Sequence, residues 1–152
     1  MATGLSNYLA NKFLDAVGNA TAYSAANVYV KLHIGDPGSA GTANPATETT
    51  RKSVSFGAAA TGGLTSDADI SWSNIAGSED ATYFTVWDNL TAGNFLFSGT
   101  VAGNAYTAGD TFTIPSGSLT VSLTFSILCP FTKNTDDERV TLLFNPGLLK
   151  FT

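Results

Sequence analysis

One short segment at the start of the chain has helical periodicity, unlike the β-like pattern that follows it. Residues 5–19 read L-S-N-Y-L-A-N-K-F-L-D-A-V-G-N. Ser6 suits the N-cap position because its hydroxyl can accept from free amides of the first turn. Gly18 and Asn19 tolerate the left-handed conformation that ends many helices. The segment predicts one amphipathic helix, whose apolar residues fall at helical spacing: Leu9, Phe13, Ala16 and Val17.

From residue 28 onward, apolar residues recur at alternate positions, as expected for strands with one buried face. In V-Y-V-K-L-H-I, residues 28–34, the aliphatic residues would face inward, and His33 would lie on the polar face with Tyr29 and Lys31. L-T-V-S-L-T-F-S-I, residues 119–127, has the strictest alternation. Turns separate further predicted strands near 54–56, 70–72, 81–88, 95–101 and 110–115, with long loops at 35–50 and 103–110.

This spacing predicts a mainly β fold, an antiparallel β-sandwich or barrel of about seven to eight strands. One N-terminal α-helix would cover an open face or end of it. Two regions are expected along the chain: residues 1–128 as a helix plus β-sandwich domain, and residues 129–152 as a C-terminal arm.

The apolar character of the C-terminal arm, residues 129–152, implies that it docks on something, because an exposed segment of this kind promotes aggregation. Two alternatives remain open: the arm closes the domain's own sheet, or it packs on a neighbouring copy or partner. The residues predicted to make structural contacts are Leu9, Phe13 and Val17, which would seat the helix, and Val140, Leu142, Leu143, Phe144, Leu148 and Phe151 in the arm. The competing interpretation is that all of them form intramolecular core.

Charge and composition exclude several classes of partner. Charged residues make up 12% of the chain and the net charge is −5, with no Lys/Arg cluster. Nucleic acids and anionic membranes are therefore not expected as partners. No secretory signal or membrane-spanning apolar run is visible. The single cysteine, Cys129, excludes an internal disulfide, in keeping with synthesis in a reducing cytoplasm.

The residues that could support catalysis do not form a convincing constellation. His33 is the only histidine, and the small carboxylate groups at 67–69, 79–80 and 136–138 all fall in predicted turns, where acids usually cap and solvate. Calcium binding and glycoside hydrolysis are minor alternatives for those acids. The chain is thus expected to have no catalytic residue, cofactor or metal site. Aromatic residues that could stack on a host-surface glycan are Tyr23, Tyr29, Tyr83, Trp87 and Tyr106.

Several motifs resemble one family of small tailed-bacteriophage virion proteins. The most specific is the opening L-S-N-Y-L-A-N-K-F-L-D, since the family pattern begins L-S-N-Y-L-x-N-K-x-L-D. The other matches are T-A-Y at 21–23, V-Y-V-K-L at 28–32, G-D-P at 35–37, R-K-S-V-S-F-G-A-A at 51–59, Y-F-T-V-W-D at 83–88, G-N-F-L-F-S-G at 93–99, and G-D-T-F-T-I with G-S-L-T-V between 109 and 121. The chain departs from the pattern at T-E-T-T before Arg51 and in its extension beyond residue 124.

Family members are usually labelled tail fibre or minor tail proteins, and some lie near head genes. The resemblance implies a non-enzymatic virion structural protein, assembled in the host bacterial cytoplasm. Because the sequence has no fibre-forming repeat, the expected function is capsid decoration (a cement protein stabilising the head). The alternative is a tail fibre or minor tail protein that contacts the host surface, and a third hypothesis is a carbohydrate-binding module. The expected partners are further copies in a homotrimer and the major capsid protein or tail proteins.

Overall fold

The computed structural model describes residues 4–124, which form one helix and nine strands. Their bounds are β1 (Gly4–Leu5), α1 (Asn7–Gly18), β2 (Val28–His33), β3 (Lys52–Val54), β4 (Gly63–Thr65), β5 (Ile70–Trp72), β6 (Glu79–Trp87), β7 (Phe95–Tyr106), β8 (Phe112–Ile114) and β9 (Thr120–Ser122). The protein is mainly β, with antiparallel sheets and an N-terminal helix, which confirms the predicted fold class.

The main sheet has five strands in the order β1-β7-β6-β2-β3. Every pair in it is antiparallel, with Val30 opposite Val86 and Val86 opposite Phe97. Since opposed residues share a face, these three apolar side chains form a row across the inner face of the sheet. Val30 and Val86 are fully buried, and Phe97 packs against the same core.

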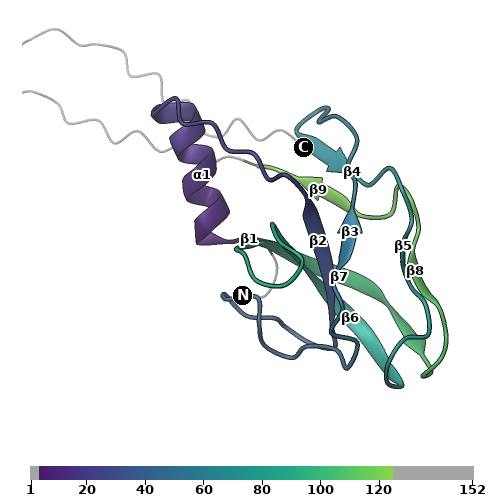
Figure 1. The fold of residues 1–152 in the computed structure, drawn as a ribbon. Coiled ribbons are helices and arrows are strands. Elements are labelled where there is room, and N and C mark those ends of the chain that lie inside the picture. The colour runs from purple at the N-terminus through teal and green to yellow at the C-terminus, as the bar shows by residue number, and fades with distance from the viewer. Residues whose placement is uncertain (1–3, 125–152) are drawn as a thin grey trace, which may run out of the picture.

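The two smaller sheets continue the β6–β7 hairpin as one long antiparallel ribbon. β5 pairs with β8, and β4 pairs with β9. Between the β5–β8 and β6–β7 pairs, the amide of Ile75 donates to the carbonyl of Asp110 over 2.9 Å and so continues the pairing. Residues 63–87 therefore run alongside residues 95–122 in the opposite direction. Figure 1 shows this ribbon bending between the β6–β7 and β5–β8 pairs, so that its far half turns back over the main sheet.

The hydrophobic core lies between the main sheet and the folded-back half of the ribbon. Trp72 is the largest fully buried side chain, and its ring lies 5.9 Å from that of Phe112 on the paired strand. Its indole Nε1 donates to the carbonyl of Thr50 over 2.8 Å. This bond ties the ribbon to the segment that leads into β3, so Trp72 joins the two layers by both packing and hydrogen bonding.

Several predicted element boundaries are wrong. β7 continues to Tyr106, where a loop was expected from residue 103, because Glu79 pairs with Tyr106 and extends the ladder. Within residues 119–124, only Thr120–Ser122 form a strand, and Leu123, expected to face inward, is 38% exposed. Residues 125–127 of that predicted strand lie outside the described residues. Ile34, also expected to face inward, is 45% exposed because β2 ends at His33.

The placement of His33 on an exposed polar face is also wrong, since its side chain is fully buried. Its Nδ1 lies 2.8 Å from the carbonyl oxygen of Ala43, and its Nε2 lies 2.9 Å from Oγ1 of Thr85. A carbonyl only accepts, so Nδ1 carries the proton and Nε2 accepts from the Thr85 hydroxyl. Burial lowers the pKa of His33, with Lys31 acting in the same direction and the Ala43 hydrogen bond opposing it.

The loop at 35–50 explains this burial, because it folds back over the outer face of the main sheet. The amide of Ile34 donates to the Asn44 carbonyl over 3.0 Å, so the returning chain pairs with the end of β2. Gly41 is buried with φ +70°, and a Cβ there would lie 2.6 Å from Cδ2 of the Phe95 ring. Only glycine allows the loop to pack so closely at this backbone conformation. Both faces of the sheet centre are therefore covered.

We expect Trp72→Ala to lower the free energy of unfolding by about 3–5 kcal/mol, since a large core side chain is replaced by a cavity. Urea unfolding followed by far-UV circular dichroism measures the change. The matched control is Ser71→Ala on the exposed face of the same strand, expected to stay within about 0.5 kcal/mol of wild type. Equal effects of the two substitutions would show that the ribbon does not depend on Trp72.

We expect the free energy of unfolding to fall as the pH drops below about 6.5, the ordinary pKa of histidine. The unfolded chain then binds a proton that the folded chain, with its lowered His33 pKa, takes up only at lower pH. The stabilisation of the folded state that comes from the lowered pKa of His33 is complete above pH 6.5. Below that pH it is lost by at most about 1.4 kcal/mol per pH unit. Urea unfolding at pH 7.5 and 5.5 should show a smaller loss in His33→Gln. The same pH dependence in the wild type and in His33→Gln would show that His33 does not cause the loss of stability.

Candidate interaction surface

Helix α1 is fixed to the main sheet at its N-terminal end. The Ser6 hydroxyl accepts from the amide of Leu9 over 3.1 Å, as predicted for an N-cap, and the Ser6 amide donates to the carbonyl of Leu96 on β7 over 2.8 Å. Leu9 is buried in the core, and the ring of Tyr8 meets that of Tyr23 edge-on with centroids 6.0 Å apart. One side of the helix is thus firmly attached.

The other side of α1 is apolar and exposed. Phe13 is half-buried against the core, but Leu14 is 63% exposed and Val17 is 84% exposed. Val17, which is expected to seat the helix, lies in the last turn of α1 and is not covered by the described residues, so its contact stays a prediction. We call Leu14 and Val17, together with the half-buried Ala10 between them, the outer helix face.

The remaining predicted contact residues lie outside the described residues. They are Val140, Leu142, Leu143, Phe144, Leu148 and Phe151 of the C-terminal arm. Cys129 also lies there. The division into a domain of residues 1–128 and an arm of residues 129–152 stays a prediction, as do the contacts of the arm.

A second side-chain cluster forms on the outer face of the main sheet, around Trp87. Its Nε1 donates to Oγ1 of Thr85 over 2.8 Å, which continues the hydrogen-bond chain to His33. The Arg51 guanidinium carbon lies 4.0 Å from the centroid of the Trp87 ring, a cation–π geometry. The same guanidinium donates to the carbonyls of Asn89 and Ala92, each over 2.6 Å. Arg51 therefore fastens the β6–β7 turn onto the sheet.

The aromatic residues considered for sugar stacking are mostly covered. Trp87 and Tyr106 are each 7% exposed, so neither offers a ring face to a glycan. Tyr23, Tyr29 and Tyr83 are half-buried. Among the five candidates, none presents a fully exposed ring of the kind that sugar stacking uses.

Carboxylates near the bend of the ribbon, between the β5–β8 and β6–β7 pairs, bind neighbouring loops. Glu79, expected in a turn, begins β6, where its Oε1 accepts from the Tyr106 hydroxyl over 2.8 Å and its Oε2 from the Thr47 hydroxyl over 3.1 Å. Burial and then the bond to Glu79 raise the pKa of Tyr106 above its ordinary value. Burial acts to raise the pKa of Glu48, but hydrogen bonds from Thr50 and Ala76 outweigh it and lower that pKa. These acids stabilise the structure.

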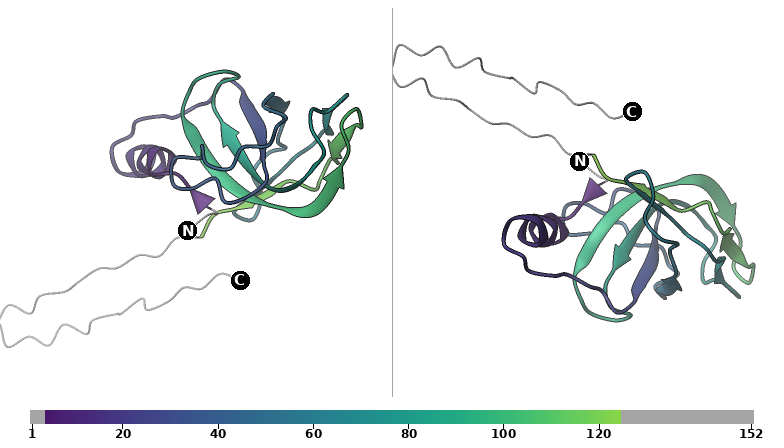
Figure 2. Two further views of the ribbon diagram at one scale, coloured as in Figure 1. Left: turned by 90° about the horizontal axis from the view of Figure 1, so that it is seen from below. Right: turned by 90° about the horizontal axis from the view of Figure 1, so that it is seen from above.

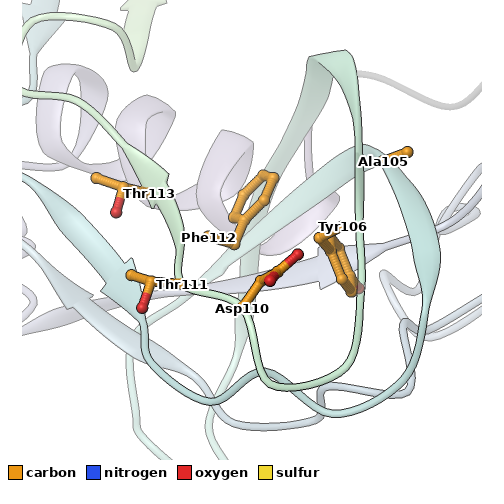
Figure 3. A pocket seen from close by; sticks show the side chains of 6 residues that line it. All are labelled: Ala105, Tyr106, Asp110, Thr111, Phe112 and Thr113. Atoms are coloured by element: carbon orange, nitrogen blue, oxygen red, sulfur yellow. The ribbon is translucent and has the colours of Figure 1, made fainter.

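Beside this bend lies an open hollow of about 420 Å³, which Figure 3 shows from close by. Its lining residues are Ala105, Tyr106, Asp110, Thr111, Phe112 and Thr113. The two aromatic rings are almost fully buried, and the Asp110 carboxylate already accepts from the amide of Thr107 over 2.9 Å. The hollow therefore offers few free groups to a ligand. Among residues 4–124, no three or more of His, Cys, Asp and Glu are grouped to hold a metal ion, and no helix is long and apolar enough to span a membrane.

The sequence contained one signal for the outer-face cluster. In Y-F-T-V-W, residues 83–87, aromatic residues occur at both alternating positions, so neither face of that strand is simply polar. A strand covered on both faces has this pattern. The partner of Thr85, however, is 52 residues away at His33, and alternation along one strand cannot identify such a partner.

Comparison with known proteins identifies a family for the chain. Residues 4–122 match the family model described as Podophage GP4 fiber I protein gp80. The matched span runs from β1 to the end of β9 and so includes every helix and strand of the described residues. No curated protein matches the chain. A phage fibre protein is a structural part of the virion.

Proposed function

The chain belongs to the family of the podophage GP4 fiber I protein gp80 and is a structural protein of the phage virion, and we propose that it is a component of the tail fibre apparatus. The observation that carries the proposal is the match over residues 4–122, which includes the whole described fold. The family description supports the fibre function better than the capsid decoration function that the sequence alone favoured.

The fold supports a compact module of a fibre rather than a fibre shaft. The described residues form a bent ribbon closed over one core, with β1 and β3 at the edges of the main sheet. These edge strands are two and three residues long, and short edges disfavour open-ended strand addition. Such a module attaches through side-chain surfaces and terminal segments.

The side chains on this fold support a function in binding rather than catalysis. His33 is buried with both ring nitrogens hydrogen-bonded, and Glu79 is committed to Thr47 and Tyr106. Neither group is free to transfer a proton to a substrate. The proposed function is therefore structural, and the homotrimer and its neighbours in the virion stay predictions.

The number of copies in a purified virion distinguishes tail from head. A tail fibre component is expected in a few to a few dozen copies, whereas a decoration protein covering the capsid would be present in hundreds. Quantitative mass spectrometry of purified particles, with isotope-labelled peptides from this chain and from the major capsid protein, gives the ratio.

Electron microscopy of virions labelled with gold-conjugated antibody provides an independent control. We expect gold at the tail and none spread over the head. Hundreds of copies with gold over the capsid would overturn the fibre proposal and restore the decoration function.

A further inference from the structure

The apolar surface of α1 is wider than the part that the described residues cover. Apart from Tyr8, its six apolar positions span about 160° of the helix circumference at about 100° per residue. In angular order they are Ala16, Leu9, Phe13, Val17, Ala10 and Leu14. Leu9 is buried and Phe13 and Ala10 are half-buried, whereas Val17 is 84% and Leu14 is 63% exposed. The outer helix face is therefore the less covered part of one continuous apolar surface.

This face differs from the other exposed apolar residues of the described chain. Leu14 and Val17 are the two most exposed large hydrophobic residues there, and they are three positions apart on one helix, so their side chains are neighbours. The remaining ones lie singly on separate segments of the chain: Leu5, Ile34, Leu90 and Leu123. Isolated exposed residues are ordinary, but an adjacent pair continuous with buried residues indicates a contact.

The chain itself supplies a segment of matching character. Residues 140–149 read V-T-L-L-F-N-P-G-L-L and contain no charge, because the nearby charged residues are at 133–139 and at Lys150. The outer helix face also has no charged residue, since Lys12 and Asp15 are half-buried on other sides of α1. Contact between two uncharged surfaces removes apolar area from water without burying a charge.

The position where the described chain ends makes the contact reachable. The amide of Leu123 donates to the carbonyl of Gly62 over 3.0 Å, which holds the chain just past β9. Figures 1 and 2 show this end on the same side of the molecule as β1 and α1. The linking residues 125–139 can extend over about 50 Å. Since α1 has 12 residues and so is about 18 Å long, the link is long enough.

We propose that residues 140–149 of the C-terminal arm dock on the outer helix face of the same chain. Leu14 and Val17 of α1 are then covered by leucines and the phenylalanine of that segment. The arm thereby completes the burial that the described residues leave unfinished. The inference holds for a position at the tail or at the head and does not depend on the proposed function.

Disulfide trapping in the full chain tests the docking. In a Cys129→Ser background, Val17→Cys is combined with Leu143→Cys and, separately, with Leu148→Cys, so that one unfavourable register does not decide the result. A disulfide requires Cα atoms within about 7 Å. We expect at least one pair to form an intrachain disulfide on mild oxidation, identified by non-reducing electrophoresis and peptide mass spectrometry.

The matched control replaces Val17→Cys by Ser71→Cys, an exposed position on β5 away from the helix. We expect little intrachain disulfide in this control. Trapping at Val17 no stronger than at Ser71 would overturn the proposal. Disulfides formed only between chains would also overturn it and would assign the outer helix face to a second copy.

Hydrogen exchange of the full chain gives a readout without cysteines. Leu142→Ser with Leu143→Ser should speed exchange of the amides in residues 10–18, whereas the amides of β2 should keep their wild-type rates. Accelerated exchange in both regions would indicate general unfolding, in which case the same measurement on Leu148→Ser decides. Unchanged exchange in α1 with β2 also unchanged would count against docking.

Discussion

The fold depends on one long antiparallel ribbon that bends back over the sheet to which its own first half belongs. Backbone pairing joins residues 63–87 to residues 95–122, but pairing alone would leave one apolar face of each half exposed. The bend brings Ile70 and Trp72 into one core with Val30 and Val86, and the Trp72 bond to Thr50 fixes the two layers. Burial of these side chains stabilises the bend, because the hydrogen bonds of the ribbon would be the same if it were straight.

The second constraint is the cover on the outer face of the main sheet. The loop at 35–50 and the Arg51 side chain bury His33, Thr85 and Trp87 on the face that would otherwise be open to solvent. The polar atoms there are linked in one chain of hydrogen bonds, so their burial does not leave unpaired groups. With both faces of the sheet centre covered, the two most exposed large hydrophobic residues among the described residues are on α1.

These features suit a protein that makes contacts within a virion. Its family is that of a phage fibre protein, and the ionisable groups of the described residues mainly hold loops together. The docking proposed for residues 140–149 would join the outer helix face to the end of the chain. In that proposal the N-terminal helix is more than a cap on the sheet, because its outer side receives a further segment.

The sequence by itself determined the elements whose signals are local. The Ser6 cap, the helical spacing of Leu9 and Phe13, and the alternation around Val30 and Ile70 depend on near neighbours, so helix, strands and fold class could be predicted. The tertiary structure decided what lies opposite each element. His33 is buried because a loop ten residues away returns over it, and Val17 is exposed because the sheet ends before reaching it. A periodic pattern tells which side of an element is apolar; only packing between distant segments determines which part of that side is covered.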